Sequence, residues 1–181
     1  MKIQTFLLTT AIGVATLFGS CKKADDAING GGSGDLAPGK GKISFNTSSG
    51  FGGNFDGSNT LLSVATRQAS TAYDQVTITS TVTEGTNVKT AMLTILCKKG
   101  LTTSAGTLNA NFSNGVSDDV FPQLTISNTA NAAQSYASES GTVTITKLTL
   151  SEVEGTFSGH FINESENTST ELTNGSFAGK F

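Results

Sequence analysis

The sequence predicts an all-β domain over residues 41–181, either a single antiparallel β-sandwich or a partly open up-and-down barrel of about eight to ten strands. Apolar residues arrive at alternate positions between hydroxyl and amide residues, as in strands with one buried and one solvated face. Pairs containing glycine recur between these runs and suit tight chain reversals. Thr, Ser, Asn and Gly dominate, whereas the helix formers Leu, Glu, Lys and Arg are scarce.

Residues 1–20 have the features of a signal peptide. Lys2 opens a short basic region, and the apolar run Phe6–Phe18 precedes the small residues Gly19 and Ser20. The run is shorter than the roughly 20 residues that a helix needs to span a bilayer. We therefore expect export and removal of this segment.

Cys21 is the predicted lipidation site. The string Leu17–Cys21 resembles a lipobox, in which the cysteine thiol receives a diacylglyceryl group and cleavage exposes its amino group. Phe18 departs from the usual aliphatic residue, although Leu17 stands one place before it. The alternative is an ordinary secretory signal cleaved near Ser20, with Cys21 unmodified.

Residues 21–40 are predicted to be the lipidated cysteine and a flexible linker. Gly30–Gly34 is rich in glycine, and a random-coil tether of about 20 residues reaches on the order of 25 Å. Two or more acyl chains hold a protein stably in a membrane. Lys22–Asp26 resembles the charged surface-export signals of Bacteroidota lipoproteins, so we expect a lipid anchor in the outer membrane, with the cell surface favoured over the periplasmic face.

Most apolar residues fit strands that bury one face and expose the other. Three features of the sequence predict departures from this pattern. The run Met92–Leu96 is apolar at both parities, which predicts a central strand covered on both sides. Pro122 belongs at a strand start, an edge or a bulge. A change of parity near Thr146–Lys147 predicts a β-bulge or bend. The predicted core-facing residues are Ile43 and Phe45; Leu62 and Val64; Val76, Ile78 and Val82; Leu93, Ile95 and Cys97; Leu124 and Ile126; Val143 and Ile145; and Leu148 and Leu150.

Glycine pairs mark the predicted turns, because glycine adopts positive φ without a steric penalty. Short turns imply antiparallel neighbours. The pairs are Glu84-Gly85, Lys99-Gly100, Asn114-Gly115, Glu154-Gly155 and Asn174-Gly175.

A local repeat marks the end of the chain, where Gly155–Phe161 is echoed by Gly175–Phe181. We expect the two segments to pair as antiparallel strands joined through 163–170. The four rings of Phe157, Phe161, Phe177 and Phe181 would then pack inward, with Gly159 and Gly179 making room beside them. An aromatic ligand cradle is the functional alternative.

Three segments carry a resemblance to a known group: Gly141–Leu148, Glu154–Gly159 and Leu172–Phe177. From about Leu62 onward the chain resembles small Bacteroidota lipoproteins of uncharacterised function. The resemblance implies an all-β domain behind a lipobox and a short linker. It supplies no catalytic residue to transfer.

Charge and residue counts exclude several functions. The net charge is −3, with 11 basic and 14 acidic side chains and no basic cluster, so nucleic acid is not an expected partner. A single histidine cannot build a multi-histidine metal site. His160 is expected on the outer face of a strand; a Ser-His-Asp triad is the alternative, but no G-x-S-x-G elbow accompanies it. Cys97 is expected in the core rather than as a nucleophile.

Carboxylates offer two further candidate sites. The first is a glycosidase pair, which needs two carboxylates about 5–10 Å apart and could come from the glutamates of the final hairpin. The second is a weak Ca²⁺ site, either in that hairpin or in a loop at Asp118-Asp119. Solvated turns also collect such residues, so we expect neither a metal nor a cofactor. The glutamates in question are Glu152, Glu154, Glu164, Glu166 and Glu171.

These observations predict a membrane-anchored module of the cell envelope that binds or supports other molecules without being an enzyme. Its expected partners are membrane lipid, through acylated Cys21, and an envelope protein or glycan. The alternative is a calycin-like carrier of a small apolar ligand inside the barrel, and a hydrolase is the third possibility.

Overall fold

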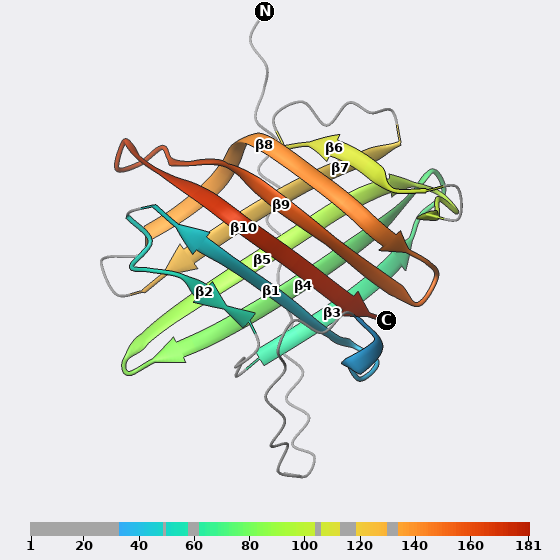
Figure 1. The fold of residues 1–181 in the computed structure, drawn as a ribbon, viewed down its shortest axis with the longest axis horizontal. Coiled ribbons are helices and arrows are strands. Elements are labelled where there is room, and N and C mark those ends of the chain that lie inside the picture. Colours follow the sequence, from blue (N-terminus) through green and yellow to red (C-terminus); the bar gives the residue numbers. More distant parts are fainter. Residues whose placement is uncertain (1–32, 49, 58–61, 104–105, 113–118, 130–133) are drawn as a thin grey trace, which may run out of the picture.

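The structure is a computed structural model that describes residues 33–48, 50–57, 62–103, 106–112, 119–129 and 134–181 (Figure 1). Residues 1–20 and Cys21, and with them the predicted signal peptide and lipidation site, lie outside the described residues. The elements are a 3-10 turn, η1 (Ser33–Asp35), and the strands β1 (Lys40–Thr47), β2 (Phe55–Asp56), β3 (Leu62–Ala69), β4 (Tyr73–Glu84), β5 (Asn87–Lys98), β6 (Leu108–Asn111), β7 (Val120–Asn128), β8 (Gln134–Leu148), β9 (Glu152–Asn163) and β10 (Thr168–Lys180).

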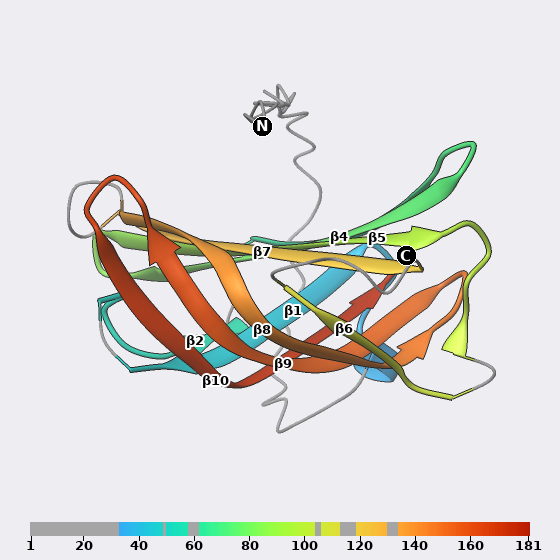
Figure 2. The same ribbon diagram turned by 90° about the horizontal axis from the view of Figure 1, so that it is seen from above.

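The ten strands form one antiparallel sheet, which confirms the all-β prediction. The order is β2-β1-β10-β9-β8-β7-β5-β4-β3, and β6 pairs with β8 outside this path. The sheet curls strongly into an open half-barrel, so that β7, β5 and β4 lie over the curved layer of β1, β10, β9 and β8 (Figure 2). Of the two expected architectures, this is the partly open barrel.

The two margins of the curled sheet approach each other at β1 and β3. The amide of Ala65 donates to the carbonyl of Gly39 at 3.0 Å, and the amide of Gly41 donates to the Ser63 hydroxyl at 2.9 Å. These bonds satisfy backbone groups that an edge strand would otherwise leave open.

The core lies on the concave face, where alternate residues of every long strand meet. Leu93, Ile95 and Cys97 on β5 are fully buried, as their spacing predicted. The other predicted core residues that are buried are Ile43, Phe45, Val76, Ile78, Leu124, Ile126, Val143, Ile145 and Leu148. Val82 is partly buried against this cluster, whereas Leu150 is exposed.

β9 and β10 pair as the Phe–Gly repeat predicted, with Phe157, Phe161 and Phe177 buried and Phe181 partly buried. The glycines that make room are different from those expected. Phe157 lies opposite Gly175 and Phe177 lies opposite Gly155. A Cβ at Gly155 would come within 2.4 Å of the Phe177 ring, and one at Gly175 within 2.5 Å of the Phe157 ring. Each ring therefore covers the glycine of the partner strand.

This pairing explains why two predicted turns are wrong. Glu154-Gly155 lies inside β9 and Asn174-Gly175 inside β10, because these glycines accommodate rings instead of reversing the chain. Asn174 adopts φ 51°, and the ladder shifts register between Leu172 and Gly175, so the second site is a bulge. The turns at Gly85 and Gly100, with φ 63° and 76°, are confirmed. Asn114-Gly115 lies outside the described residues.

Two further irregularities occur where they were predicted. The β8–β9 ladder shifts register between Ile145 and Lys147, which confirms the bulge. Pro122 lies near the start of β7, in the stretch that pairs with β5 only, since the β7–β8 ladder begins at Thr125. A missing amide hydrogen is tolerated in such an edge position.

Three predictions about buried faces are wrong. Leu150 is 76% exposed because β8 ends at Leu148 and Leu150 lies in the turn before β9. Leu62 and Val64 are 55% and 38% exposed, because β3 places Ala65 opposite Ile78 and turns its larger apolar residues outward. Met92 and Leu96 are 39% and 37% exposed, since the sheet is a single layer here and only the concave face of β5 is covered by the described chain.

Candidate functional site

The described chain begins at one end of the half-barrel, which we call the linker end. Ser33 is buried there, and its backbone amide and hydroxyl donate to Glu154 Oε1 at 2.8 and 2.5 Å. Lys147 Nζ lies 2.5 Å from Glu152 Oε2 and 3.5 Å from Glu154 Oε1. The start of the described chain is therefore attached to β9 through a carboxylate.

These contacts shift the pKa values of the linker end. The bond to Glu152 raises the pKa of Lys147 and lowers that of Glu152. Burial of Glu154 opposes ionisation, but the bonds from Ser33 and the charge of Lys147 outweigh it, so the pKa of Glu154 is lowered. At neutral pH the ammonium group of Lys147 therefore lies between the two ionised carboxylates of Glu152 and Glu154.

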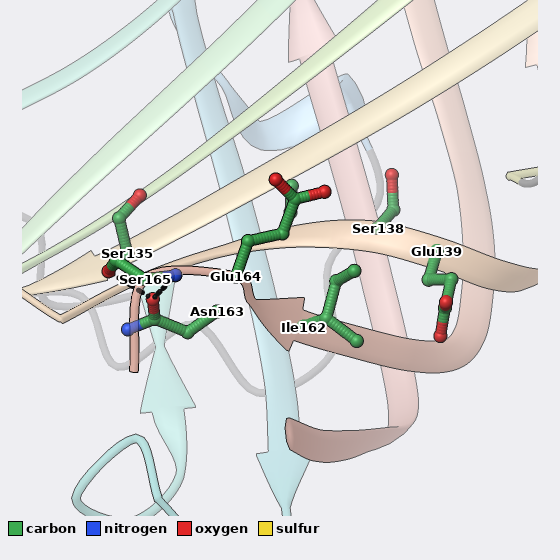
Figure 3. A pocket seen from close by; sticks show the side chains of 8 residues that line it. Ser135, Ser138, Glu139, Ile162, Asn163, Glu164 and Ser165 are labelled. Atoms are coloured by element: carbon green, nitrogen blue, oxygen red, sulfur yellow. Dashed lines mark hydrogen bonds between the residues drawn. The ribbon is translucent and has the colours of Figure 1, made fainter. Parts of the chain in front are cut away.

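A second polar cluster occupies the other end of β9 and contains the depression that we call the acidic groove. One part of it has a volume of about 580 Å³ and the adjoining part about 430 Å³. Figure 3 shows Ser135, Glu139, Ile162, Asn163 and Glu164 around the first part. The residues shared by both parts are Glu139, Ile162, Asn163 and Glu164.

The groove exists because β8 carries a bulge and β9 ends in a turn. The β8–β9 ladder shifts between Ser138 and Ser140, which leaves Glu139 as an extra residue beside the groove. On the other side, the chain turns after Asn163 before β10 begins at Thr168. Side chains from three strand ends thus meet on the outer surface.

His160 lies on the outer face of β9, as predicted, with its side chain 33% exposed. Its Nδ1 is 2.6 Å from Glu171 Oε1, directly across the β9–β10 ladder, and its Nε2 is 3.7 Å from Glu139 Oε2. A histidine that activates a nucleophile must present one ring nitrogen to a hydroxyl or thiol. Here both nitrogens face carboxylates.

Asn163 has a fixed orientation in the groove. It is 3% exposed, and its Oδ1 accepts bonds from the amides of Ser165 and Glu166 at 3.1 and 3.3 Å. This Asx turn directs Nδ2 away from those donors, and Nδ2 has no hydrogen-bond partner among the described residues. A buried donor without a partner favours any ligand that offers an acceptor.

The five glutamates singled out in the sequence do not form one site. Glu152 and Glu154 lie at the linker end, whereas Glu164, Glu166 and Glu171 lie at the groove end. Within the described ranges, no group of three or more His, Cys, Asp and Glu side chains could hold a metal ion. Asp119 pairs with Lys98 at 3.6 Å, and Asp118 lies outside the described residues.

The remaining candidates have structural roles. Cys97 is buried with its thiol 3.5 Å from the carbonyl of Asp74, and burial raises its pKa, which disfavours the reactive thiolate. Two of the rings considered as a ligand cradle, Phe157 and Phe177, contact each other with centroids 6.5 Å apart. Phe157 also packs against Phe45 and Phe112 of the core, with centroids 6.1 and 6.2 Å away.

Sequence reasoning missed Glu139 and Asn163. Asn163, with Ser165 two residues later, has an Asx-turn spacing that could have been recognised. Glu139 gave no signal, because its position depends on the bulge in β8. It also missed the buried pair at the linker end, where Arg67 lies 2.5 Å from Asp74.

No protein-family profile, curated protein or solved structure matches this chain. Across the part of the chain that the structure describes, no helix has the length and apolarity required to cross a membrane.

Proposed function

We propose that this protein is a lipid-anchored module of the outer membrane that binds a partner without catalysis, through the acidic groove. The observation that carries the proposal is the location of the groove. Glu154, which binds Ser33, and Asn163, which lines the groove, are nine residues apart on β9, or roughly 30 Å along an extended strand. A domain held from its linker end would present the groove away from the anchor.

The chemistry of the groove favours a basic partner. Glu139 and Glu164 line the groove and Glu171 lies beside it against His160, so all three supply negative charge, and Asn163 Nδ2 supplies a donor for a backbone carbonyl. Ala137 and Ile162 add a small apolar strip that could contact the aliphatic part of a lysine or arginine. A Lys- or Arg-rich segment of an envelope protein fits this combination better than a neutral glycan, because none of the described residues that line the groove is a Phe, Tyr or Trp on which a sugar could stack.

The interior supports a binding role on the surface over a carrier role. Between the two layers, where a carrier would hold an apolar ligand, Phe45 stacks on Phe55 at 5.1 Å and Phe112 meets Phe161 edge-on at 5.5 Å. Packed rings at these distances fill volume that a ligand would need.

The experiment is a titration of the full chain, in a neutral detergent, with a hexalysine peptide observed by amide NMR. We expect shifts at Glu139, His160 and Asn163, and weaker binding after Glu164→Gln or Glu171→Gln, because each variant removes one facing charge. Asp119→Asn is the control, since it removes the same charge at the linker end. Equal binding by all three variants, or shifts produced by maltohexaose instead, would contradict the proposed partner.

A further inference from the structure

His160 is the only histidine in the sequence, and it lines the acidic groove. Its side chain lies on the outer face of β9 between carboxylates from both neighbouring strands. Glu171 comes from β10, directly opposite on the ladder, and Glu139 comes from the bulge of β8. The groove therefore contains one titratable ring that is flanked by acidic side chains.

Both ring nitrogens of His160 face acceptors. Nδ1 is 2.6 Å from Glu171 Oε1, which is a hydrogen-bond distance, and Nε2 is 3.7 Å from Glu139 Oε2. A neutral imidazole carries one N–H and can donate to only one of these carboxylates, whereas the imidazolium ion carries two. The side chain of Glu139 is 53% exposed, so it is free to rotate toward the ring. Protonation of His160 thus lets one ring bind both carboxylates.

No other group that can become a cation lines the groove in the ranges that the structure describes. The residues around its two parts include no Lys or Arg. Lys89 lies at the same end of the sheet, but it is buried on the concave face and pairs with Glu84. The charge that a basic partner meets is therefore set by three carboxylates and the ring. The carboxylates are those of Glu139, Glu164 and Glu171.

We propose that the charge of His160 regulates the groove: a neutral ring allows a basic partner to bind, and a protonated ring weakens that binding. Regulation of this kind presupposes the proposed function, since it concerns the same partner. The imidazolium ion acts as an internal counterion of Glu139 and Glu171, so the ammonium or guanidinium group of a partner must compete with it. Histidine is the side chain that ordinarily changes charge between pH 5 and pH 8. Binding should therefore be stronger at pH 8 than at pH 5.5.

The same coupling acts in the opposite direction, because linkage between two binding events is reciprocal. A partner that prefers the neutral ring must itself favour that form, so its binding displaces a proton from His160. Complex formation near pH 6.5 should consequently release a fraction of a proton to the solvent. Calorimetric titrations in two buffers of different ionisation enthalpy measure this fraction.

The test measures the dissociation constant of acetylated hexalysine amide for the full chain in a neutral detergent at pH 8.0, 6.5 and 5.5. This peptide has no free α-amino group, so its own charge stays constant over the range. At constant ionic strength the dissociation constant should rise about three- to tenfold from pH 8.0 to pH 5.5, because two exposed carboxylates gain an internal partner.

Three variants identify the group responsible. His160→Gln should make binding independent of pH over this range, because glutamine does not titrate. Glu139→Gln should reduce the ratio of the dissociation constants at pH 5.5 and pH 8.0, since it removes the carboxylate that the second N–H binds. Asp119→Asn removes a charge at the linker end, so it is the matched control and should keep the wild-type ratio. Circular dichroism at both pH values checks that each variant is folded.

Binding of equal strength at pH 8.0 and pH 5.5 would overturn the regulation by His160 and leave the proposed function standing. A pH dependence that persists in the folded His160→Gln chain would overturn it as well, because another group would then be the one that titrates. The absence of binding at all three pH values would contradict the proposed function itself, and the regulation with it.

Discussion

The reciprocal contact between phenylalanine and glycine is the most specific packing device in the molecule. Phe157 covers Gly175 and Phe177 covers Gly155, so a side chain at either glycine would occupy the space of a ring. The sequence repeat predicted the rings and their face, but not which glycines they cover. That depends on the register of β9 and β10, which the bulge at Asn174 shifts.

Gly175→Ala should destabilise the protein by about 1–3 kcal/mol, because the new methyl group would lie 2.5 Å from both the Phe157 ring and the Phe157 carbonyl oxygen in a packed core. The same substitution in a Phe157→Leu background should cost less than in the wild type, since the smaller side chain removes the ring contact and leaves only the contact with the backbone carbonyl. Urea unfolding of the two single variants and the double variant measures this coupling. Strictly additive costs would show that the ring is not what excludes the methyl group.

At the scale of the elements, the alternation of apolar and polar residues predicted correctly which side chains face the core. It did not predict correctly whether the opposite face of a strand is covered. The core-facing residues of β1, β4, β5, β7 and β8 could be predicted, because each packs across the core and must therefore be apolar. Leu62 and Met92 were assigned to covered positions because hydrophobicity alone does not say whether a second layer exists. The half-barrel supplies one layer, and the register of β3 against β4 decides which of its residues turn outward.

A buried ion pair joins two neighbouring strands to the turn between β8 and β9. Arg67 of β3 contacts Asp74 of β4 at 2.5 Å and also donates to the carbonyl of Thr149, between β8 and β9, at 2.5 Å. The bond from Arg67 holds the pKa of Asp74 below its ordinary value, although burial opposes it. The pair therefore attaches the margin of the sheet to the linker end.

Stability should consequently fall in acid. Asp74, Glu152 and Glu154 all have lowered pKa values in the folded state, so their contribution is present above the unfolded values of 3.8 and 4.5 and is lost as the pH falls through the lower folded values. Lys147 acts in the opposite direction: its raised pKa gives stability below 10.5 that is lost at higher pH. Thermal unfolding between pH 2 and pH 11 should show a plateau between these limits.

Asp74→Asn tests the part played by the buried pair. The variant should lower the melting temperature at pH 6 and reduce the further drop between pH 5 and pH 2, because the ionisable partner of Arg67 is gone. An acid transition as steep as that of the wild type would assign the effect to other carboxylates.

At the scale of the whole molecule, the linker end and the acidic groove lie at opposite ends of β9. The sequence indicated His160 on an outer face and glutamates in the last hairpin, and the structure places these beside Glu139 and Asn163. The groove itself was not predictable, since it requires the β8 bulge and the β9–β10 turn to meet. The proposed lipid anchor is the opposite: it is predicted from the sequence of residues 17–21 alone, and these lie outside the described residues.

The central proposal is that lipid attachment at Cys21 makes this domain a membrane module, and intact-mass measurement of membrane fractions from the native host tests it most directly. Wild-type protein should be found in the membrane at the mass of the chain from Cys21 onward plus acyl groups. Cys21→Ser should leave the membrane fraction and lose the acyl mass, whereas Cys97→Ser, which alters only the buried thiol, should keep both. Recovery of the Cys21→Ser chain in the membrane with the wild-type modification would contradict the proposed anchor.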